Sequence, residues 1–259
     1  MVDAPPRVTA DAAMNAPAIV FDRVSLDFSG KPLFRDLSLR LEGGQTTCIL
    51  GPSGCGKSTL LKLIAGSLAL PYTGNIFLDT ACPGGQQVAW MGQNDLLLPW
   101  LTLLDNVLLG ARLRHQLSET RRQQALALIR EAGLAGYEQA LPMTLSGGMR
   151  QRGALLRTLM EGRPVLLMDE PFSALDALTR VRLQSLAARL TQGATVVLVT
   201  HDPLEALRLA NRIIVLAGEP VQVAEILDLG GATPRDPGDP TVTGQYPGLL
   251  RMLMNGEGP

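Results

Sequence analysis

The chain has 259 residues, of which 46% are hydrophobic, and this is enough for a packed core in one large domain or two smaller ones. Its 23 basic and 24 acidic residues give a formal net charge of -1, which excludes a global electrostatic attraction to nucleic acid or anionic lipid. The longest apolar runs are far shorter than the roughly 20 residues of a membrane-spanning helix, and three cysteines without metal-ligand spacing favour a reducing compartment such as the cytoplasm.

The N-terminal part of the sequence predicts a leader followed by strands. Residues 1–17 contain no basic segment leading into an apolar stretch, so we expect a flexible leader without a secretory signal. Residues 18–28 and 37–41 alternate apolar and polar side chains around an "SGK" turn, which is typical of antiparallel strands with one wet face. Residues 46–50, "TTCIL", form a short apolar strand, and residues 57–68 have helical spacing. Strand, glycine-rich loop and helix make half of a parallel α/β unit.

The loop "GPSGCGKST" between this strand and helix has the pattern of a phosphate-binding loop. Gly51, Gly56, Lys57 and Ser58 satisfy G-x-x-x-x-G-K-[ST] in the required context. Glycines let backbone N–H groups approach a phosphate, Lys57 neutralises its oxygens, and Ser58 offers a hydroxyl to Mg²⁺. The alternative is a glycine-rich turn that binds nothing. The expected triphosphate ligands are Gly51, Pro52, Ser53, Gly54, Cys55, Gly56, Lys57, Ser58 and Thr59.

The central and C-terminal parts of the chain predict a helical insertion, further parallel strands and a tail. Residues 94–160 contain no comparable strand, so we expect an inserted helical subdomain there. Within it, Ser118 is a plausible N-cap for a helix over 118–134. Buried parallel strands are expected at 165–169, 195–200 and 212–218, with a helix over 175–190 between the first two. One α/β domain therefore spans 18–230, and the Gly- and Pro-rich residues 231–259 predict an irregular tail with a short helix at "LLRML".

Three polar side chains follow two of the expected strands. Asp169 and Glu170 end the first, and His201 ends the next, where open parallel sheets bind ligands. Asp169 can hold Mg²⁺ through water, and Glu170 can accept a proton from an attacking water. The alternatives are a polar strand exit for the acidic pair and a structural role for the lone histidine.

One further motif makes the chain resemble a known family. The stretch "LSGGMRQR" places a serine and two glycines at the start of an evident helix, which is another anion site. Together with the glycine loop and the "DEP" strand end, it makes residues 18–220 similar to the ATP-binding subunits of ABC transporters. The resemblance implies that Ser146, Gly147 and Gly148 grip the γ-phosphate of ATP bound to a second copy of the chain.

The resemblance also implies roles for four other residues. Gln93 matches the glutamine that senses the metal and the γ-phosphate, and His201 matches the histidine that contacts that phosphate. Phe28 lies where an aromatic ring stacks on adenine, although a core phenylalanine is the serious alternative. Asp176, in "SALD", matches a residue that communicates between the two sites. A small departure is Met149, where many members have glutamine.

By this resemblance the fold is α/β: a P-loop NTPase core, an antiparallel β subdomain and an inserted helical subdomain. Two subunits close on two ATP molecules, with Mg²⁺ as cofactor and with Glu170, His201, Gln93 and Lys57 in the catalytic machinery. The chain resembles most the bacterial importers of nitrate, taurine, alkanesulfonates and pyrimidine precursors of thiamine. Alternatives are an exporter or lipid-transport ATPase, a soluble ABC protein of DNA repair or translation and, last, a nucleotide kinase.

The expected partners follow from the same resemblance. They are a second copy, an integral-membrane permease and, indirectly, an extracytoplasmic solute-binding protein, at the cytoplasmic face of the bacterial inner membrane; no nucleic acid is expected. Residues 96–102, "LLLPWLT", are apolar, and we expect Trp100 to line a groove that receives a short permease helix. The alternative for Trp100 is local packing within the helical block.

Overall fold

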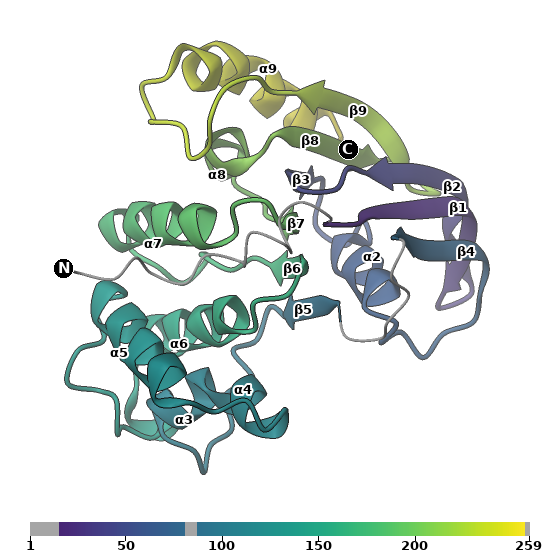
Figure 1. The fold of residues 1–259 in the computed structure, drawn as a ribbon. Coiled ribbons are helices and arrows are strands. Elements are labelled where there is room, and N and C mark those ends of the chain that lie inside the picture. The colour runs from purple at the N-terminus through teal and green to yellow at the C-terminus, as the bar shows by residue number, and fades with distance from the viewer. Residues whose placement is uncertain (1–15, 81–86, 257–259) are drawn as a thin grey trace.

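The computed structural model describes residues 16–80 and 87–256, which form two sheets and several layers of helices (Figure 1). Most of the expected leader, residues 1–15, lies outside the described residues. The strands are β1 (Ala18–Phe28), β2 (Lys31–Leu41), β3 (Thr46–Leu50), β4 (Tyr72–Asp79), β5 (Val88–Met91), β6 (Val165–Asp169), β7 (Thr195–Val199), β8 (Arg212–Ala217) and β9 (Gln222–Asp228). The helices are α2 (Lys57–Ile64), α3 (Leu103–Val107), α4 (Leu109–Leu113), α5 (Glu119–Glu131), η1 (Pro142–Thr144), α6 (Gly147–Met160), α7 (Ala177–Leu190), α8 (Pro203–Leu209) and α9 (Pro240–Gly256).

The larger sheet has six strands in the order β5-β6-β7-β3-β8-β9. All neighbours are parallel except β8 and β9, and this confirms the predicted α/β fold. Alternate residues of its central strands enter two different cores: Cys48 and Leu50 pack in one, and Ile49 in the other. Both faces are covered, so these strands read as continuous apolar runs in the sequence.

Helices and the second sheet cover the two faces. One core lies between the large sheet, α2 and the three-stranded antiparallel sheet β2-β1-β4. The other lies under α6, α7, α8 and the helical block formed by α3, α4 and α5, on the opposite side in Figure 1. The predicted pair β1 and β2 is antiparallel, with β2 beginning earlier than expected, and β4 completes that sheet.

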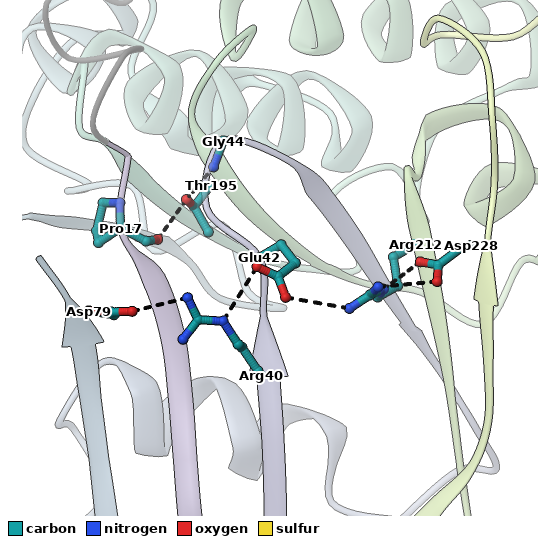
Figure 2. A network of polar contacts seen from close by, with 8 residues as sticks. All are labelled: Pro17, Arg40, Glu42, Gly44, Asp79, Thr195, Arg212 and Asp228. Atoms are coloured by element: carbon teal, nitrogen blue, oxygen red, sulfur yellow. Dashed lines mark hydrogen bonds and ion pairs between the residues drawn. The ribbon is translucent and has the colours of Figure 1, made fainter.

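A polar network joins the two sheets at one edge (Figure 2). Arg40 of β2 pairs with Asp79 of β4 at 3.0 Å and with Glu42 at 3.4 Å. Glu42 lies 3.9 Å from Arg212 of β8, whose guanidinium binds Asp228 of β9 at 2.6 Å and 3.1 Å. These pairs are largely exposed and contribute little stability individually, but together they link four strands from both sheets.

A second link in the same view is buried. The Thr195 hydroxyl of β7 donates to the Pro17 carbonyl at 2.8 Å and accepts from the Gly44 amide at 2.9 Å. Pro17 directly precedes β1, and Gly44 lies between β2 and β3. One side chain of the large sheet therefore holds both the start of β1 and the connection from β2 to β3.

The C-terminal region differs from the expected irregular tail. Residues 240–256 form the single helix α9, which contains Pro247. The Asp239 carboxylate accepts from the Thr241 amide at 2.8 Å at its start, and Val242 and Leu249 are buried in the core that also contains α8. Tertiary packing of these two side chains outweighs the low helix propensity of the Gly- and Pro-containing sequence. Among the described helices, none combines the length and the apolarity that a membrane span requires.

Candidate functional site

The glycine loop connects β3 to α2, as predicted, and its backbone requires glycine at two positions. A Cβ atom at Gly51 would lie 2.5 Å from the Leu216 carbonyl oxygen, so no side chain fits there. Gly56 is the N-cap of α2 with φ 87°, a left-handed conformation that favours glycine. The loop thus curls tightly into the N-terminus of α2, where backbone N–H groups and the helix dipole attract an anion.

Lys57 places a positive charge inside this loop. Its side-chain Nζ lies 2.7 Å from both the Gly51 and the Pro52 carbonyl oxygens, and the residue is buried. The same ammonium lies 3.9 Å from the Cys55 Sγ. Burial raises the pKa of the Cys55 thiol, and the charge of Lys57 opposes this rise without cancelling it. The Cys55 thiol is therefore protonated and uncharged, and Lys57 supplies the positive charge of the loop.

A cleft of 1020 Å³ opens beside the loop. The aromatic ring of Phe28 is 49% exposed and lines it, so the alternative that Phe28 is a core residue is wrong. A volume of this size and a free aromatic face suit a nucleotide base and its sugar. The lining residues are Phe28, Lys31, Pro32, Leu33, Pro52, Ser53, Gly54, Cys55, Gly218, Glu219 and Val221.

Ser58 and Asp169 meet at the end of β6. The Ser58 side chain lies close enough to the Asp169 carboxyl group to affect its pKa, and Asp169 is 5% exposed. Burial raises the pKa of Asp169 and nearby Glu170 adds to the rise, while Ser58 and the charge of Lys57 oppose it. A hydroxyl and a carboxylate are the hard oxygen ligands that Mg²⁺ takes together with substrate phosphates. These residues therefore fit a magnesium ion.

Glu170 and His201 face each other across two neighbouring strands. The His201 Nδ1 lies 3.2 Å from the Glu170 Oε1, and the Glu170 side chain is 21% exposed. Glu170 has φ 49°, a conformation that is costly for a non-glycine residue and is often found at functional sites. The structure thus brings the two predicted side chains into contact at the carboxyl end of the sheet.

Gln93 lies at the same sheet edge as these residues. The parallel register pairs Met91 with Met168, so Gln93 follows β5 where Asp169 ends β6. Its side chain is exposed. Its role as a metal ligand stays a prediction.

The signature residues are not among the residues that line the nucleotide cleft. Ser146 caps α6 by accepting a hydrogen bond from the Met149 amide at 3.3 Å, and Gly147 and Gly148 form the first turn. Asp176 caps α7 by accepting from the Thr179 amide, and this bond lowers the pKa of its carboxyl group. The residues that line the 1020 Å³ cleft include none of these.

Gln151 is a residue that motif reasoning missed. Its amide nitrogen donates to the Glu170 carbonyl at 3.0 Å and to the Ser173 hydroxyl at 3.1 Å, and its oxygen accepts from the Ala174 amide at 2.8 Å. One buried side chain of α6 therefore holds the loop after Glu170. Its place in "LSGGMRQR", one turn after the two glycines, was the available signal.

Trp100 is exposed rather than packed in the helical block. The ring is 71% exposed, so the alternative of local packing is wrong. The loop that carries it is held by fully buried Asn106, whose amide donates to the Leu98, Leu101 and Thr102 carbonyls at 3.0–3.1 Å. Trp100 is thus an exposed aromatic side chain on an ordered loop.

A groove of 400 Å³ lies next to this loop, between β5, α4 and α6. Arg157 belongs to its lining and donates to the Leu96 carbonyl at 2.7 Å, which connects groove and loop. Leu113 and Trp90 supply exposed apolar surface in it. The lining residues are Val88, Ala89, Trp90, Leu109, Gly110, Leu113, Arg157, Thr158, Glu161 and Arg163.

Comparison with known proteins adds independent findings. Residues 34–173 match the family described as ABC transporter. The chain is 44% identical to the aliphatic sulfonates import ATP-binding protein SsuB 1 of Rhodococcus jostii (strain RHA1), over 87% of this chain and 89% of that one. It is 43% identical to the taurine import ATP-binding protein TauB of Yersinia pestis bv. Antiqua (strain Antiqua), over 78% of this chain and 81% of that one.

The fold has solved counterparts as well. A dimeric structure of a post-hydrolysis state of the ATP-binding cassette MJ0796, bound to ADP and Pi, superposes with a TM-score of 0.70 at 29% sequence identity. The alignment covers 83% of this chain and 100% of that one.

Proposed function

The chain belongs to the ABC transporter family and is an ATPase, and from this premise we propose that its ATP hydrolysis powers import of a small organic sulfonate through a separate membrane permease. The importer names of its sulfonate and taurine relatives support the solute class. They also favour import over the alternative of an exporter or lipid-transport system. The observation that carries the ATPase site is the convergence of Lys57, the Ser58–Asp169 pair and the Glu170–His201 pair at one sheet edge.

In the proposed mechanism each residue has a separate task. Phe28 stacks on adenine, and the loop amides with the Lys57 ammonium bind the phosphates. Ser58 and Asp169 would hold Mg²⁺, whose charge screens the phosphate oxygens. Glu170 accepts the proton of the attacking water, and its contact with His201 keeps both side chains turned to the γ-phosphate. The pattern is positioning plus charge stabilisation, as phosphoryl transfer requires.

Two copies are proposed to complete each site. Ser146, Gly147 and Gly148 form a helix N-terminus that suits a phosphate, yet they do not line the chain's own cleft. The dimeric cassette with bound ADP and Pi supports an arrangement in which this turn reaches the nucleotide of a partner. Gln93 would sense the metal and γ-phosphate, and Asp176 would transmit changes between the sites.

The permease is proposed to bind at the helical block. A short helix with an apolar face would place its side chains in the groove beside Trp90 and Leu113 and cover Trp100. This contact holds the chain at the cytoplasmic face of the bacterial inner membrane as a peripheral subunit. An extracytoplasmic solute-binding protein would deliver the solute from the other side.

The test is genetic complementation combined with ATP binding. A host that lacks this gene should fail to grow on taurine or an alkanesulfonate as sole sulfur source. Wild type and Lys62→Ala should restore growth, because Lys62 is exposed on the same helix. Lys57→Ala should not, because loss of a charge-assisted phosphate contact weakens ATP binding of the purified chain by about 100-fold. Full ATPase activity of Lys57→Ala would overturn the site, and unimpaired growth of the deletion strain would overturn the solute class.

A further inference from the structure

The backbone of Glu170 is held in an unusual conformation by hydrogen bonds at both of its ends. Its φ of 49° is costly for a residue other than glycine. Its amide donates to the Val199 carbonyl of β7 at 2.9 Å. Its carbonyl oxygen accepts from the Ser173 hydroxyl at 3.1 Å and from the Gln151 side-chain amide at 3.0 Å. Because the backbone conformation limits where a side chain can point, these bonds also fix the direction of the Glu170 carboxylate.

Gln151 binds residues 170–174, here called the catalytic loop, at three points. Besides the bond to the Glu170 carbonyl, its amide nitrogen donates to the Ser173 hydroxyl at 3.1 Å, and its oxygen accepts from the Ala174 amide at 2.8 Å. The residue is 7% exposed, and a buried backbone group that loses its partner is costly. Gln151 therefore fixes the catalytic loop relative to α6.

The first turn of α6 also lies against the catalytic loop. A Cβ atom at Gly148 would lie 3.1 Å from the Ala174 carbonyl oxygen. Gln151 is thus placed to support either residues 146–148, here called the signature turn, or Glu170. Its side-chain hydrogen bonds favour the second role, because each of the three ends on the loop that begins at Glu170.

We propose that Gln151 is a positioning residue for ATP hydrolysis: it holds Glu170 of its own chain in the conformation that faces the γ-phosphate, although it lies on the helix that serves the partner's nucleotide. The inference deepens the proposed function and rests on the role proposed there for Glu170. Gln151 is not among the residues that line the nucleotide cleft. Loss of its bonds should therefore slow the chemical step and leave ATP binding in place.

The first experiment measures ATP hydrolysis and ATP binding by the purified full-length chain. Gln151→Met keeps an unbranched side chain of similar size and removes its hydrogen bonds. It should lower kcat at least about tenfold and leave the Kd for ATP within about twofold of wild type. Gln184→Met is the matched control, because Gln184 is also a buried glutamine but binds Glu205 and Arg208 outside the catalytic loop. It should retain kcat even where it lowers thermal stability.

The second measurement does not depend on activity. Removing the Gln151 oxygen leaves the Ala174 amide without this acceptor, so in Gln151→Met the amide should exchange with deuterium at least about tenfold faster. The Thr179 amide, which is bonded to the Asp176 carboxylate at the start of α7, should exchange at the wild-type rate. Gln184→Met should change neither amide.

Mixed dimers separate the two roles of Gln151. In a mixture of Lys57→Ala and Ser146→Ala chains, the complete site takes its phosphate-binding loop and Glu170 from the Ser146 variant and its signature turn from the Lys57 variant. Gln151→Met added to the Ser146→Ala chain should lower the activity of the mixture at least about tenfold. Added to the Lys57→Ala chain, it should leave that activity nearly unchanged, because the Glu170 of this chain serves the site that is already inactive.

Wild-type kcat in Gln151→Met, an unchanged Ala174 amide, or an equal or larger loss when the substitution is in the Lys57→Ala chain would overturn the inference. An inactive Glu170→Gln would still support the catalytic site in each of these cases. A fully active Glu170→Gln would instead overturn the role proposed for Glu170, and this inference with it. A mixture of the two parent variants that recovers no activity would overturn the two-copy site alone, and kcat and amide exchange of Gln151→Met would still decide this inference.

Discussion

At the scale of single residues, the environment of Glu205 makes stability depend on pH. Its pKa is raised from 4.5 to about 7 in the folded chain, so between these values the folded state binds a proton that the unfolded state does not. The resulting stabilisation is complete below the unfolded pKa and is lost as pH rises through the folded one. At alkaline pH the folded state therefore contains a buried carboxylate, which lowers its stability.

Glu205→Gln removes this buried charge and should therefore raise stability at alkaline pH. At about pH 8.5 we expect the variant to unfold at a higher urea concentration than wild type, because its free energy of unfolding is larger by up to about 3 kcal/mol. Near pH 4.5 we expect no difference between the two proteins. Because other titrating groups are common to both proteins, the difference isolates Glu205. Glu225→Gln, at an exposed carboxyl group on β9, should show no difference. Equal stability at alkaline pH would contradict the prediction.

At the scale of elements, the loop between β5 and α3 presents Trp100 rather than burying it. Asn106 of α3 is fully buried and fills its hydrogen-bonding capacity with the backbone of this loop, including a 2.8 Å bond that its oxygen accepts from the Leu98 amide. The element is ordered before any partner binds, so docking a helix on it costs little conformational entropy.

Trp100→Asp should weaken binding to the permease at least about 30-fold, because an exposed tryptophan that becomes buried is a typical hot spot. Intrinsic ATP binding should be unchanged, since the nucleotide cleft is elsewhere. Surface-captured chain and detergent-solubilised permease give the affinity. Phe77→Asp, which alters a 49% exposed aromatic on β4, is the control and should bind normally. Equal affinities for the two variants would rule out this docking surface.

At the scale of the whole molecule, we propose that the complete site belongs to two chains, with the phosphate-binding loop of one and the signature residues of the other. Variants at Lys57 and at Ser146 should each be inactive alone. In a mixed dimer, however, the Ser146 variant supplies an intact loop and the Lys57 variant an intact signature, so one of the two sites is whole.

An equimolar mixture of Lys57→Ala and Ser146→Ala should recover about a quarter of wild-type ATPase activity, because half of the dimers are mixed and each has one intact site. The rate is measured after subunit exchange and compared with each variant alone. A mixture no more active than its separate components would show that the nucleotide is enclosed by a single chain. Wild type mixed with Lys57→Ala serves as the reference for exchange.

Local sequence was sufficient for some parts of the protein. β3 and β6 were predicted with their true bounds, because strands buried on both faces need uninterrupted apolar residues whatever surrounds them. The glycine loop could be predicted equally well, because its backbone geometry and close packing require glycine at Gly51 and Gly56. The N-cap of α5 at Ser118 follows the same local rule and is confirmed.

Other parts were decided by tertiary structure. β4 and β9 are mostly exposed edge strands, and α9 contains Pro247, so neither periodicity nor propensity marks them. They exist because a neighbouring strand or the apolar face of α8 offers a partner. The same holds for Glu205, whose pKa and contacts arise where α7, α8 and the end of β7 meet. The sequence by itself determined the features that local backbone geometry requires, such as the glycine loop. Only the tertiary structure decided the features that depend on segments distant along the chain, because the burial and the electrostatic surroundings of a side chain are set by all of its neighbours at once.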